Sequence, residues 1–521
     1  MKRRIGGTRG NPASDENAAG RSRRSFLKTS LGLVGGAAMA PAVSCVSAQS
    51  GAQDAVRDRI ERQMQDPKGR VLLKGATIIS MDPKVGDLAK GDLLIEGKKI
   101  VDIKPEIGVT AEVLDASGTI MIPGFGDTHR HPSGTTWTLE GLSALPFTSP
   151  PSPIARLAGR PPAQSGGGGN SINAQMQAED MYATTFVTAL TCIKSGVTCH
   201  MDWAGNSRSP EFADAAVQAL IDSGARAVYG YGGTTSASNE RPYEDLVRLQ
   251  KKFFSSSDQL VSLYLATNIR VPDQQTIDRI KFARDHGLRI TIDGADWPEQ
   301  GEIIVRLGKG GHLGPDITIV HLNDVGEAAW KTMAEHGVTV SLAAFSETLI
   351  GIADASPPIQ EALAVGIRPS LSSDVFQFSD FFTVMRMALN FQRSEAFASW
   401  YKGDSNPPTP ISLRDVLEFA TVQGVKANGL LDKCGTLTPG KEADLVLIRY
   451  DDVNTVTLPN ALAAVVMAAD TSNVSTVFIG GKLKKFNRQL VGTDEAKGAR
   501  LYRESRDRVF ARANYKLDSL K

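Results

Sequence analysis

Short apolar runs recur along the middle of this chain, and amphipathic stretches with the apolar spacing of a helix separate them. The segments PEFADAAVQALIDSG and DVGEAAWKTMAEHG show that helical spacing. Eight runs have the length and composition of strands, at residues 119–125, 198–203, 227–232, 261–268, 290–296, 317–323, 338–345 and 369–375. Strands that alternate with helices in this way predict an α/β fold, a (β/α)8 TIM-type barrel over residues 122–430.

Shorter β-rich runs, separated by Gly and Asp turns, lie on both sides of the predicted barrel. VLLKGATIISMD, GDLLIEGKKIVDI and EVLDASGTIMIPGF precede it, and GTLTPGKEADLVLIRY and VSTVFIGGKLKKF follow it. We therefore expect residues 70–121 and 431–487 to pair as one composite β-sandwich, after a polar helical lead-in over residues 49–69. The charged segment 488–521 predicts a C-terminal helix that packs on this small domain.

Residues 146–171, PFTSPPSPIARLAGRPPAQSGGGGNS, interrupt the predicted barrel after its first strand. Their Pro and Gly content is incompatible with a regular helix or strand. Because barrel chemistry lies at the loops that follow the strands, two interpretations of this insertion stay open. It is either a lid over the site or a plain surface loop.

The composition is that of a soluble globular protein, with 521 residues, 41% apolar and 22% charged. A net charge of +1 gives no reason to expect nucleic acid as a partner.

Residues 1–48 differ from the rest of the chain in their charge, with eight Lys or Arg against two Asp or Glu. There SRRSFLK, with Arg23 and Arg24, precedes an apolar, glycine-rich run and the small residues VSA. This pattern is that of a secretory signal and resembles the twin-arginine signal.

We accordingly predict cleavage after Ala48 and delivery by the twin-arginine translocase to the periplasm or the medium, with no stable membrane insertion afterwards. Cys192, Cys199 and Cys434 would remain, an odd number that implies no disulfide framework. We expect all three to be buried apolar thiols. The sequence leaves the oligomeric state open, with a homo-oligomer among the alternatives.

Imidazoles and carboxylates follow the predicted strands of the barrel, where the carboxyl ends of all strands meet at one face. The chain has only seven histidines, and IPGFGDTHRH contains two of them, His129 and His131. The other polar groups at strand ends are Asp202, Asp293, Asp296, His321, Glu347 and Asp374. Their convergence indicates a divalent metal ion that activates water for attack on a small-molecule substrate.

Five motifs resemble, in order and spacing, those of the amidohydrolase superfamily: PGFGDTHRH, SGVTCHMDW, IVHLN, GIRPSLSSDV and GTLTPGKEADLVLI. The branch is that of cytosine deaminase, guanine deaminase, S-adenosylhomocysteine deaminase and the triazine hydrolases, or chlorohydrolases. The resemblance covers residues 71–487 and implies a distorted barrel with a composite β-sandwich. It also implies one Zn²⁺ or Fe²⁺ per chain, since VSLYLATNIR lacks the lysine that bridges two metals in binuclear members.

The resemblance implies that His129, His131 and Asp374 are metal ligands. The family takes a further ligand from His-x-x-Glu on strand five, where this chain reads Asp293-Gly-Ala-Asp296. Asp293 is the candidate for that ligand, because carboxylates also bind Zn²⁺ and Fe²⁺. Two Asp and two His leave a divalent site formally neutral, which acidifies bound water less and makes Mn²⁺ plausible. The site is then either active with a changed metal preference or degenerate.

By resemblance, Asp374 would orient the water and move its proton, and His321 would hydrogen-bond the developing oxyanion or the substrate. Asp296 would protonate the leaving nitrogen. Glu347 and Trp203 are expected to contact substrate, whereas His200 is expected to be a buried, hydrogen-bonded residue outside the ligand set.

The expected function is an exported metal-dependent hydrolase of carbon–nitrogen bonds other than peptide bonds. Its reaction would be that of a deaminase or cyclic amidohydrolase on a small heterocycle. Two alternatives stay open: a metal-dependent lyase, decarboxylase or lactonase, and a metal-poor barrel that binds a small molecule without turnover.

Overall fold

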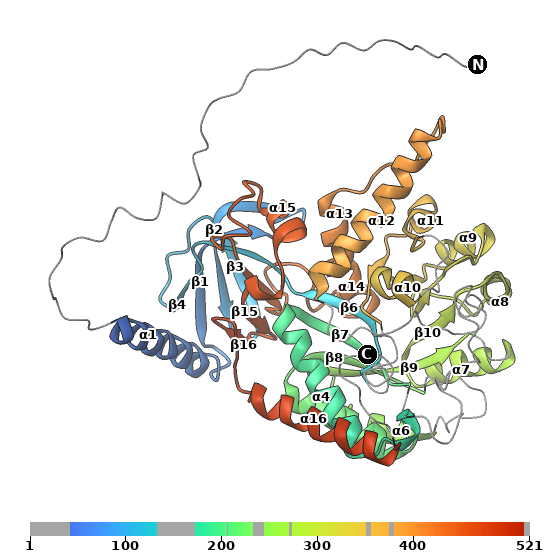
Figure 1. Cartoon of the computed structure of the whole chain (residues 1–521), viewed down its shortest axis with the longest axis horizontal. Coiled ribbons are helices and arrows are strands. Elements are labelled where there is room, and N and C mark those ends of the chain that lie inside the picture. Colours follow the sequence, from blue (N-terminus) through green and yellow to red (C-terminus); the bar gives the residue numbers. More distant parts are fainter. Residues whose placement is uncertain are drawn as a thin grey trace, which may run out of the picture. The chain divides into compact units, whose positions relative to one another are not determined.

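A barrel and a β-rich domain make up the residues from Gln53 onward, which form one compact unit in the computed structural model (Figure 1). The structure describes residues 42–132, 172–205, 207–232, 244–269, 273–350, 356–374 and 380–514. The twin-arginine motif and the 146–171 insertion lie outside these ranges. Among the described residues, no helix combines the length and apolarity that a membrane span requires.

Eight parallel strands form the barrel, in sheet order identical to chain order. They are β6 (Phe125–Arg130), β7 (Val197–Trp203), β8 (Arg226–Tyr231), β9 (Val261–Asn268), β10 (Arg289–Ala295), β11 (Ile317–His321), β12 (Thr339–Leu342) and β13 (Ser370–Leu371). A parallel bridge between Arg130 and Asp374 brings the first and last strands together. The predicted fold class, an α/β barrel of this type, is confirmed.

Helices connect the strands around the outside of the barrel (Figure 1). They are α4 (Ala178–Ser195), α5 (Pro210–Ser223), α6 (Glu244–Phe253), α7 (Asp273–Asp285), α8 (Pro298–Lys309), α9 (Glu327–Glu335), α10 (Ala344–Ile350), α11 (Ile359–Ala364), α12 (Phe381–Tyr401), α13 (Leu413–Glu418) and α14 (Gly424–Ala427). Helix α5 shows how the local sequence sets where a helix begins and ends. Pro210 starts it, where a missing N–H costs nothing, and Gly224 ends it with φ 66°.

The run at residues 119–125 was predicted as the first barrel strand, and the structure divides it. Strand β5 (Thr119–Pro123) belongs to the second sheet, and the barrel begins with β6. Gly124 separates the two, because a Cβ there would lie only 2.0 Å from Thr198 Oγ1. Because only a residue without a side chain fits against β7 at this point, the chain crosses from one sheet to the other at Gly124.

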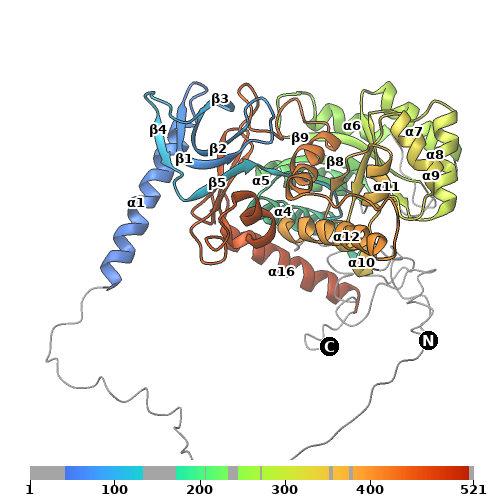
Figure 2. The ribbon, with the colours of Figure 1, turned by 90° about the horizontal axis from the view of Figure 1, so that it is seen from above.

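The second sheet has nine strands drawn from both flanks of the barrel (Figure 2). They are β1 (Arg70–Ile79), β2 (Asp87–Glu96), β3 (Lys99–Lys104), β4 (Glu112–Asp115), β5, β14 (Leu445–Arg449), β15 (Val474–Ile479), β16 (Lys482–Phe486) and β17 (Gln489–Leu490). Strand β14 pairs antiparallel with both β5 and β15, so the C-terminal flank adds directly to the N-terminal one. The pairing of the two flanks that was expected for a composite β-sandwich is therefore present, within one continuous nine-stranded sheet. Short elements α15 (Ala461–Ala463), η4 (Ala464–Ala468) and η5 (Thr471–Asn473) precede β15.

A buried ion pair ties the barrel to this sheet. The guanidinium of Arg226 on β8 donates to both carboxylate oxygens of Asp444, over 2.7 and 2.8 Å, and to Glu442 over 2.6 Å. The side chains of Arg226 and Asp444 are each 1% exposed. The two domains are thus joined by charged groups that water cannot reach.

Two helices flank the domains. Helix α1 (Ala42–Gln63) covers residues 49–63 of the lead-in expected at 49–69, and turns follow it. The C-terminal helix, α16 (Glu495–Arg512), was expected to pack on the small domain, but it packs chiefly along α4 of the barrel (Figure 1). The reason is Asp180 of α4, which is fully buried and accepts hydrogen bonds from Ser505 and Arg512 of α16. Cys192, Cys199 and Cys434 are buried free thiols, as predicted.

Candidate active site

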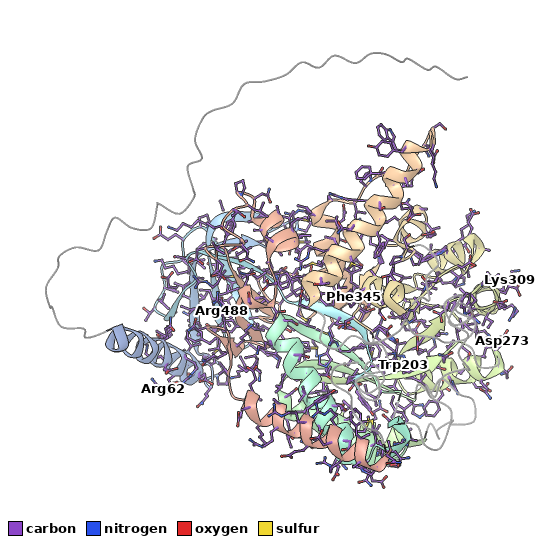
Figure 3. The ribbon with its side chains drawn as sticks, in the orientation of Figure 1. Arg62, Trp203, Asp273, Lys309, Phe345 and Arg488 are labelled. Carbon is purple, nitrogen blue, oxygen red and sulfur yellow. The ribbon has the colours of Figure 1, made fainter. Side chains whose placement is uncertain are left out.

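The pair His129 and His131 lies at the carboxyl end of β6. Their imidazole rings meet edge to face with centroids 4.5 Å apart. His129 is fully buried, whereas the His131 side chain is 14% exposed. Both rings contact the indole of Trp203 at the end of β7, at 5.8 and 5.0 Å between centroids. Figure 3 labels Trp203 at this place.

Asp374 is held against these histidines by the backbone. Its N–H donates to the His129 carbonyl over 2.8 Å, and its own carbonyl accepts from the His131 N–H over 3.2 Å. Its Oδ1 lies 3.4 Å from His129 Nε2 and 3.3 Å from His131 Nε2. The other oxygen, Oδ2, accepts a 2.5 Å hydrogen bond from Ser346 of α10. The carboxylate therefore presents one oxygen to both imidazoles.

Asp293 of β10, which stands where the family pattern has a histidine, lies in the same cluster. Its Oδ1 is 3.9 Å from His129 Nε2 and 3.3 Å from His321 Nε2. Asp293 is 7% exposed, so it faces the barrel interior rather than solvent. Asp296 follows the same strand and is 2% exposed. Burial opposes a charged His321, but hydrogen bonds to Asp293 and Glu347 and the charges of Asp374 and Asp296 hold the pKa of its imidazole well above the ordinary value.

His321 ends β11 with φ 72°, a left-handed backbone that is unusual for a residue with a side chain. Its Nδ1 lies 3.0 Å from Glu347 Oε1, and the same oxygen accepts the Ala343 N–H over 2.9 Å. Glu347 was expected on a loop in contact with substrate. It lies instead in α10 and is completely buried, because α10 begins directly after the short β12. Its observed contact is therefore His321.

Asp202 and His200 do not join this cluster. In parallel pairing, Asp202 lies beside Arg130 and Tyr229, and Tyr229 is part of the core between strands and helices. Their side chains thus point away from the barrel interior, to the opposite side from Trp203. His200 is buried as expected, but neither of its ring nitrogens has a hydrogen-bond partner among the described residues, so the expected hydrogen bond is wrong. Burial, helped by the charge of Arg130, lowers the His200 pKa to about 3 and keeps it neutral.

The charges in the cluster favour ionised carboxylates. Burial alone would raise the pKa of Asp374, but the imidazoles of His129 and His131 outweigh it and hold the pKa well below its ordinary value. Asp293 shows the same balance, with His321 and His129 lowering its pKa. Burial, reinforced by the neighbouring His131, lowers the pKa of His129. The centre therefore combines charged oxygen donors with at least one neutral imidazole, a suitable combination for a cation.

The model of the amidohydrolase family matches residues 120–484. The chain belongs to the amidohydrolase family. The resemblance inferred from its motifs is thereby confirmed.

Two curated amidohydrolase relatives are deaminases. The 5'-deoxyadenosine deaminase of Methanosarcina mazei is 25% identical over 464 residues, covering 85% of this chain and 99% of its own length. The 5-methylthioadenosine/S-adenosylhomocysteine deaminase of Thermococcus onnurineus is 26% identical and covers 73% of this chain and 85% of its own.

Solved structures share the fold at lower identity. An adenosine deaminase from Xanthomonas campestris with bound zinc has a TM-score of 0.69 at 19% identity, covering 85% of this chain and 98% of its own. Atrazine chlorohydrolase from Arthrobacter aurescens, complexed with zinc, has a TM-score of 0.68 at 20% identity, covering 84% and 100%. These similarities support the barrel and β-rich domain as one amidohydrolase architecture.

The side chains of this amidohydrolase fit a divalent ion. Within the described residues, two groups of donor atoms lie within 4.8 Å of one another: His129, His131 and Asp374, and His129, Asp293 and His321. Neither ring nitrogen of fully buried His129 has a hydrogen-bond partner of good geometry in the described chain. A buried imidazole left this way is costly unless another group completes its coordination. Imidazole nitrogen and carboxylate oxygen are the donors that Zn²⁺ and Fe²⁺ use.

Sequence reasoning missed the residues that hold these donors in place. Ser346 fixes Asp374, as described above. Asp127 joins the first and last strands, since Ser373 donates to it from Oγ (2.5 Å) and from the backbone N–H (3.2 Å). The motifs GFGDTHRH and LSSD contain Asp127 and Ser373, but only the closed barrel shows that they meet.

Proposed function

We propose that this amidohydrolase is an exported deaminase that hydrolyses the bond between a small planar heterocycle and its exocyclic amino group. The observation that carries the proposal is the convergence of His129, His131, Asp293 and Asp374 at the end of the barrel. Family membership supports the hydrolytic chemistry, and the deaminase relatives support an aminated purine nucleoside as the first substrate class to test. Export rests on the SRRSFLK segment at residues 22–28.

His129, His131, Asp293 and Asp374 would hold one divalent metal ion, with Zn²⁺, Fe²⁺ and Mn²⁺ as candidates. Such an ion supplies a water nucleophile at neutral pH. The protein then has to orient that water, accept its proton and deliver a proton to the leaving nitrogen.

Asp374 would accept the proton of the attacking water. Ser346 occupies its Oδ2 and the backbone fixes its position, so Oδ1 is the oxygen that faces the imidazoles. Asp296, at the end of β10, would donate a proton to the departing amine. Its carboxyl group is one methylene shorter than the glutamate of the family pattern, so it requires the substrate nitrogen to sit closer to β10.

Trp203 would meet the substrate with its edge. Its indole packs against both His129 and His131 and is buried, so its Nε1, beside the reaction centre, is the group that would contact a heterocycle. Its Nε1 has no hydrogen-bond partner within the described residues, although the side chain is 1% exposed. A ring nitrogen or carbonyl of the substrate would satisfy this donor.

The test combines metal analysis with ammonia release. Protein recovered through its natural export route is assayed for bound metal, then incubated with aminated purine nucleosides, pyrimidines, pterins and triazines. We expect one ion per chain and ammonia from at least one compound. The double variant His129→Ala/His131→Ala should lose both, while His312→Ala, a matched change on a loop outside the cluster, should lose neither.

Other outcomes point elsewhere. A full equivalent of metal with no ammonia from any compound would reject deamination and favour lyase, decarboxylase or lactonase chemistry on the same fold. Protein that folds but takes up no metal would reject hydrolysis altogether and favour a barrel that binds small molecules without turnover. Normal export after loss of the arginine pair would reject the proposed route.

A further inference from the structure

We propose that the C-terminal end of α12 and the proline segment that returns along it form an interface between two copies of this chain. This surface lies outside the candidate active site, so the proposal goes beyond the proposed function and does not depend on it. It answers the question of oligomeric state that the sequence leaves open.

Three aromatic side chains at the end of α12 are exposed. Phe397 is 49% exposed, Trp400 59% and Tyr401 81%. The rings of Trp400 and Tyr401 meet edge to face with centroids 4.8 Å apart, so they form one projecting ridge. Figure 1 shows this end of α12 extending beyond the helices around it. Scattered exposed apolar residues are normal, but a contiguous apolar patch of this kind marks an interaction surface.

A groove lies beside the ridge, and the wall opposite α12 is fixed in place. Gln392 of α12 donates from Nε2 to the Thr409 carbonyl over 3.0 Å and accepts the Ile411 N–H over 2.8 Å. Arg393 Nε donates to the Ile411 carbonyl over 2.9 Å. The proline rings restrict this segment further. The groove therefore exists before any partner binds, which lowers the entropic cost of association. It has a volume of about 430 Å³ and is lined by Phe397, Trp400, Tyr401, Pro407, Pro408 and Pro410.

The surface is complementary to itself. Two copies related by a two-fold axis meet through the same patch, so that patch must contain both a projection and a hollow. The ridge of Trp400 and Tyr401 adjoins the groove, so the ridge of one copy can enter the groove of the other. Aromatic rings would then pack on proline rings twice in the same interface.

The charges at the rim allow the same pairing. Lys402 and Asp404 are both exposed, have opposite signs and lie two residues apart. A two-fold axis can therefore place Lys402 of one copy against Asp404 of the other, whereas a rim of a single sign would repel itself. A surface that docks on anionic lipid needs an excess of Lys and Arg instead. The balanced rim favours a second copy over a membrane.

The exposed area is large enough to matter. At about 200 Å² for a fully exposed aromatic side chain, the three rings present roughly 400 Å² in each copy at their observed exposures. One partner contributes about 800 Å² to a standard interface. The rings alone would therefore supply about half of the area that a stable dimer needs, and the proline segment adds to it.

The first experiment measures the mass of the purified full chain by light scattering over a dilution series. We expect twice the chain mass for the wild type. The dissociation constant of the dimer should rise at least about 30-fold for Trp400→Ser/Tyr401→Ser, the usual effect of losing aromatic anchors. The matched control, Val453→Ser/Val456→Ser, should dimerise like the wild type, because these residues are 87% and 59% exposed but do not line the groove. Far-UV circular dichroism should show all three proteins folded.

The second experiment locates the contact. A benzophenone amino acid in place of Tyr401, in a mixture of isotopically light and heavy chains, should crosslink to residues 396–410 of the other copy. This crosslink decides the question even if the double variant does not fold.

Three results would overturn the proposal: a wild type that is monomeric throughout the dilution series, an unchanged dissociation constant in the Trp400→Ser/Tyr401→Ser variant, or a crosslink to any other part of the chain. A monomeric wild type that binds vesicles of phosphatidylglycerol and phosphatidylethanolamine, with binding lost in that variant, would reject the dimer and assign the patch to a membrane surface.

Discussion

The buried guanidinium of Arg226 offers the sharpest test of how the two domains are joined. Replacement by methionine keeps most of the side-chain volume but removes three hydrogen bonds, two to Asp444 and one to Glu442. The pKa of Arg226 is raised above its ordinary value: burial opposes the charge, but the charge and hydrogen bonds of Asp444 outweigh burial. Arg226 therefore stays charged in the folded protein. The Arg226→Met variant leaves the buried Asp444 carboxylate without its cation.

The size of the loss follows from what remains. Removing one partner of a buried ion pair costs about 3–5 kcal/mol of unfolding free energy. Asp444 still accepts the Gly480 N–H over 2.7 Å, and Glu442 still has Lys98 at 3.4 Å, so we place the loss in the lower half of that range. The double variant Arg226→Met/Asp444→Asn, which removes both charges, should recover more than half of the loss.

The assay is urea unfolding followed by tryptophan fluorescence, with unfolding free energies compared at a common slope. Arg306→Met is the matched control, because Arg306 forms an ion pair with Asp273 in which the side chains are 53% and 36% exposed. An exposed pair of this kind contributes about 0–1 kcal/mol. A loss for Arg226→Met no larger than that of the control would refute the reasoning that burial sets the cost.

Substitutions of three single residues and of the arginine pair test four further features. In zinc titrations, Asp293→Ala should weaken binding at least 10–100-fold while Asp293→His retains it; equal binding by all three proteins would show that Asp293 is not a ligand. Lys485 is 1% exposed, and burial lowers its pKa to about 7. Between pH 7 and pH 10 the Lys485 amine is therefore protonated in the unfolded chain but neutral in the folded protein. The free energy of unfolding should rise over this range, and Lys485→Met should make the rise shallower. Asp202 is the opposite case, because burial raises its pKa to about 8. Between pH 4 and pH 8 it is protonated in the folded protein but ionised in the unfolded chain, so its contribution to the free energy of unfolding should fall over this range. Asp202→Asn should abolish the fall. Retention of the precursor in the cytoplasm is expected for Arg23→Lys/Arg24→Lys, and normal export would contradict the twin-arginine prediction.

The barrel and the histidine pair could be predicted from sequence because each rests on a local, repeated signal. Alternating apolar runs and helices give the strand order, and two histidines one residue apart at a strand end give a shared direction. The presence of Asp293 and Asp374 beside them follows from the rule that barrel strands end at one face, and both carboxylates lie within 4.0 Å of His129 Nε2, at 3.9 and 3.4 Å.

The remaining details depend on packing that no local pattern encodes. The run TIMIPGF is apolar throughout, so only the contact of Gly124 with Thr198 reveals that two sheets share it. A register shift between Asp127 and Arg130 in the β6–β7 pairing adds one residue to β6, whereas Asp202 stays two residues from His200 on β7 and shares its outward face. The burial of Glu347 depends on how soon α10 begins after β12.

The bridge between Arg130 and Asp374 has a consequence for the whole molecule. The last barrel strand meets the first there, since the Asp374 N–H donates to the His129 carbonyl and the His131 N–H donates to the Asp374 carbonyl. The seam that closes the barrel is thus also a wall of the proposed metal centre. Opening the seam would separate the donors and release the ion, so metal occupancy and closure are linked equilibria. An ion present at about 100 times its dissociation constant would resist opening by about 2.7 kcal/mol. Chelation should therefore loosen strands β6 and β13 before the rest of the barrel.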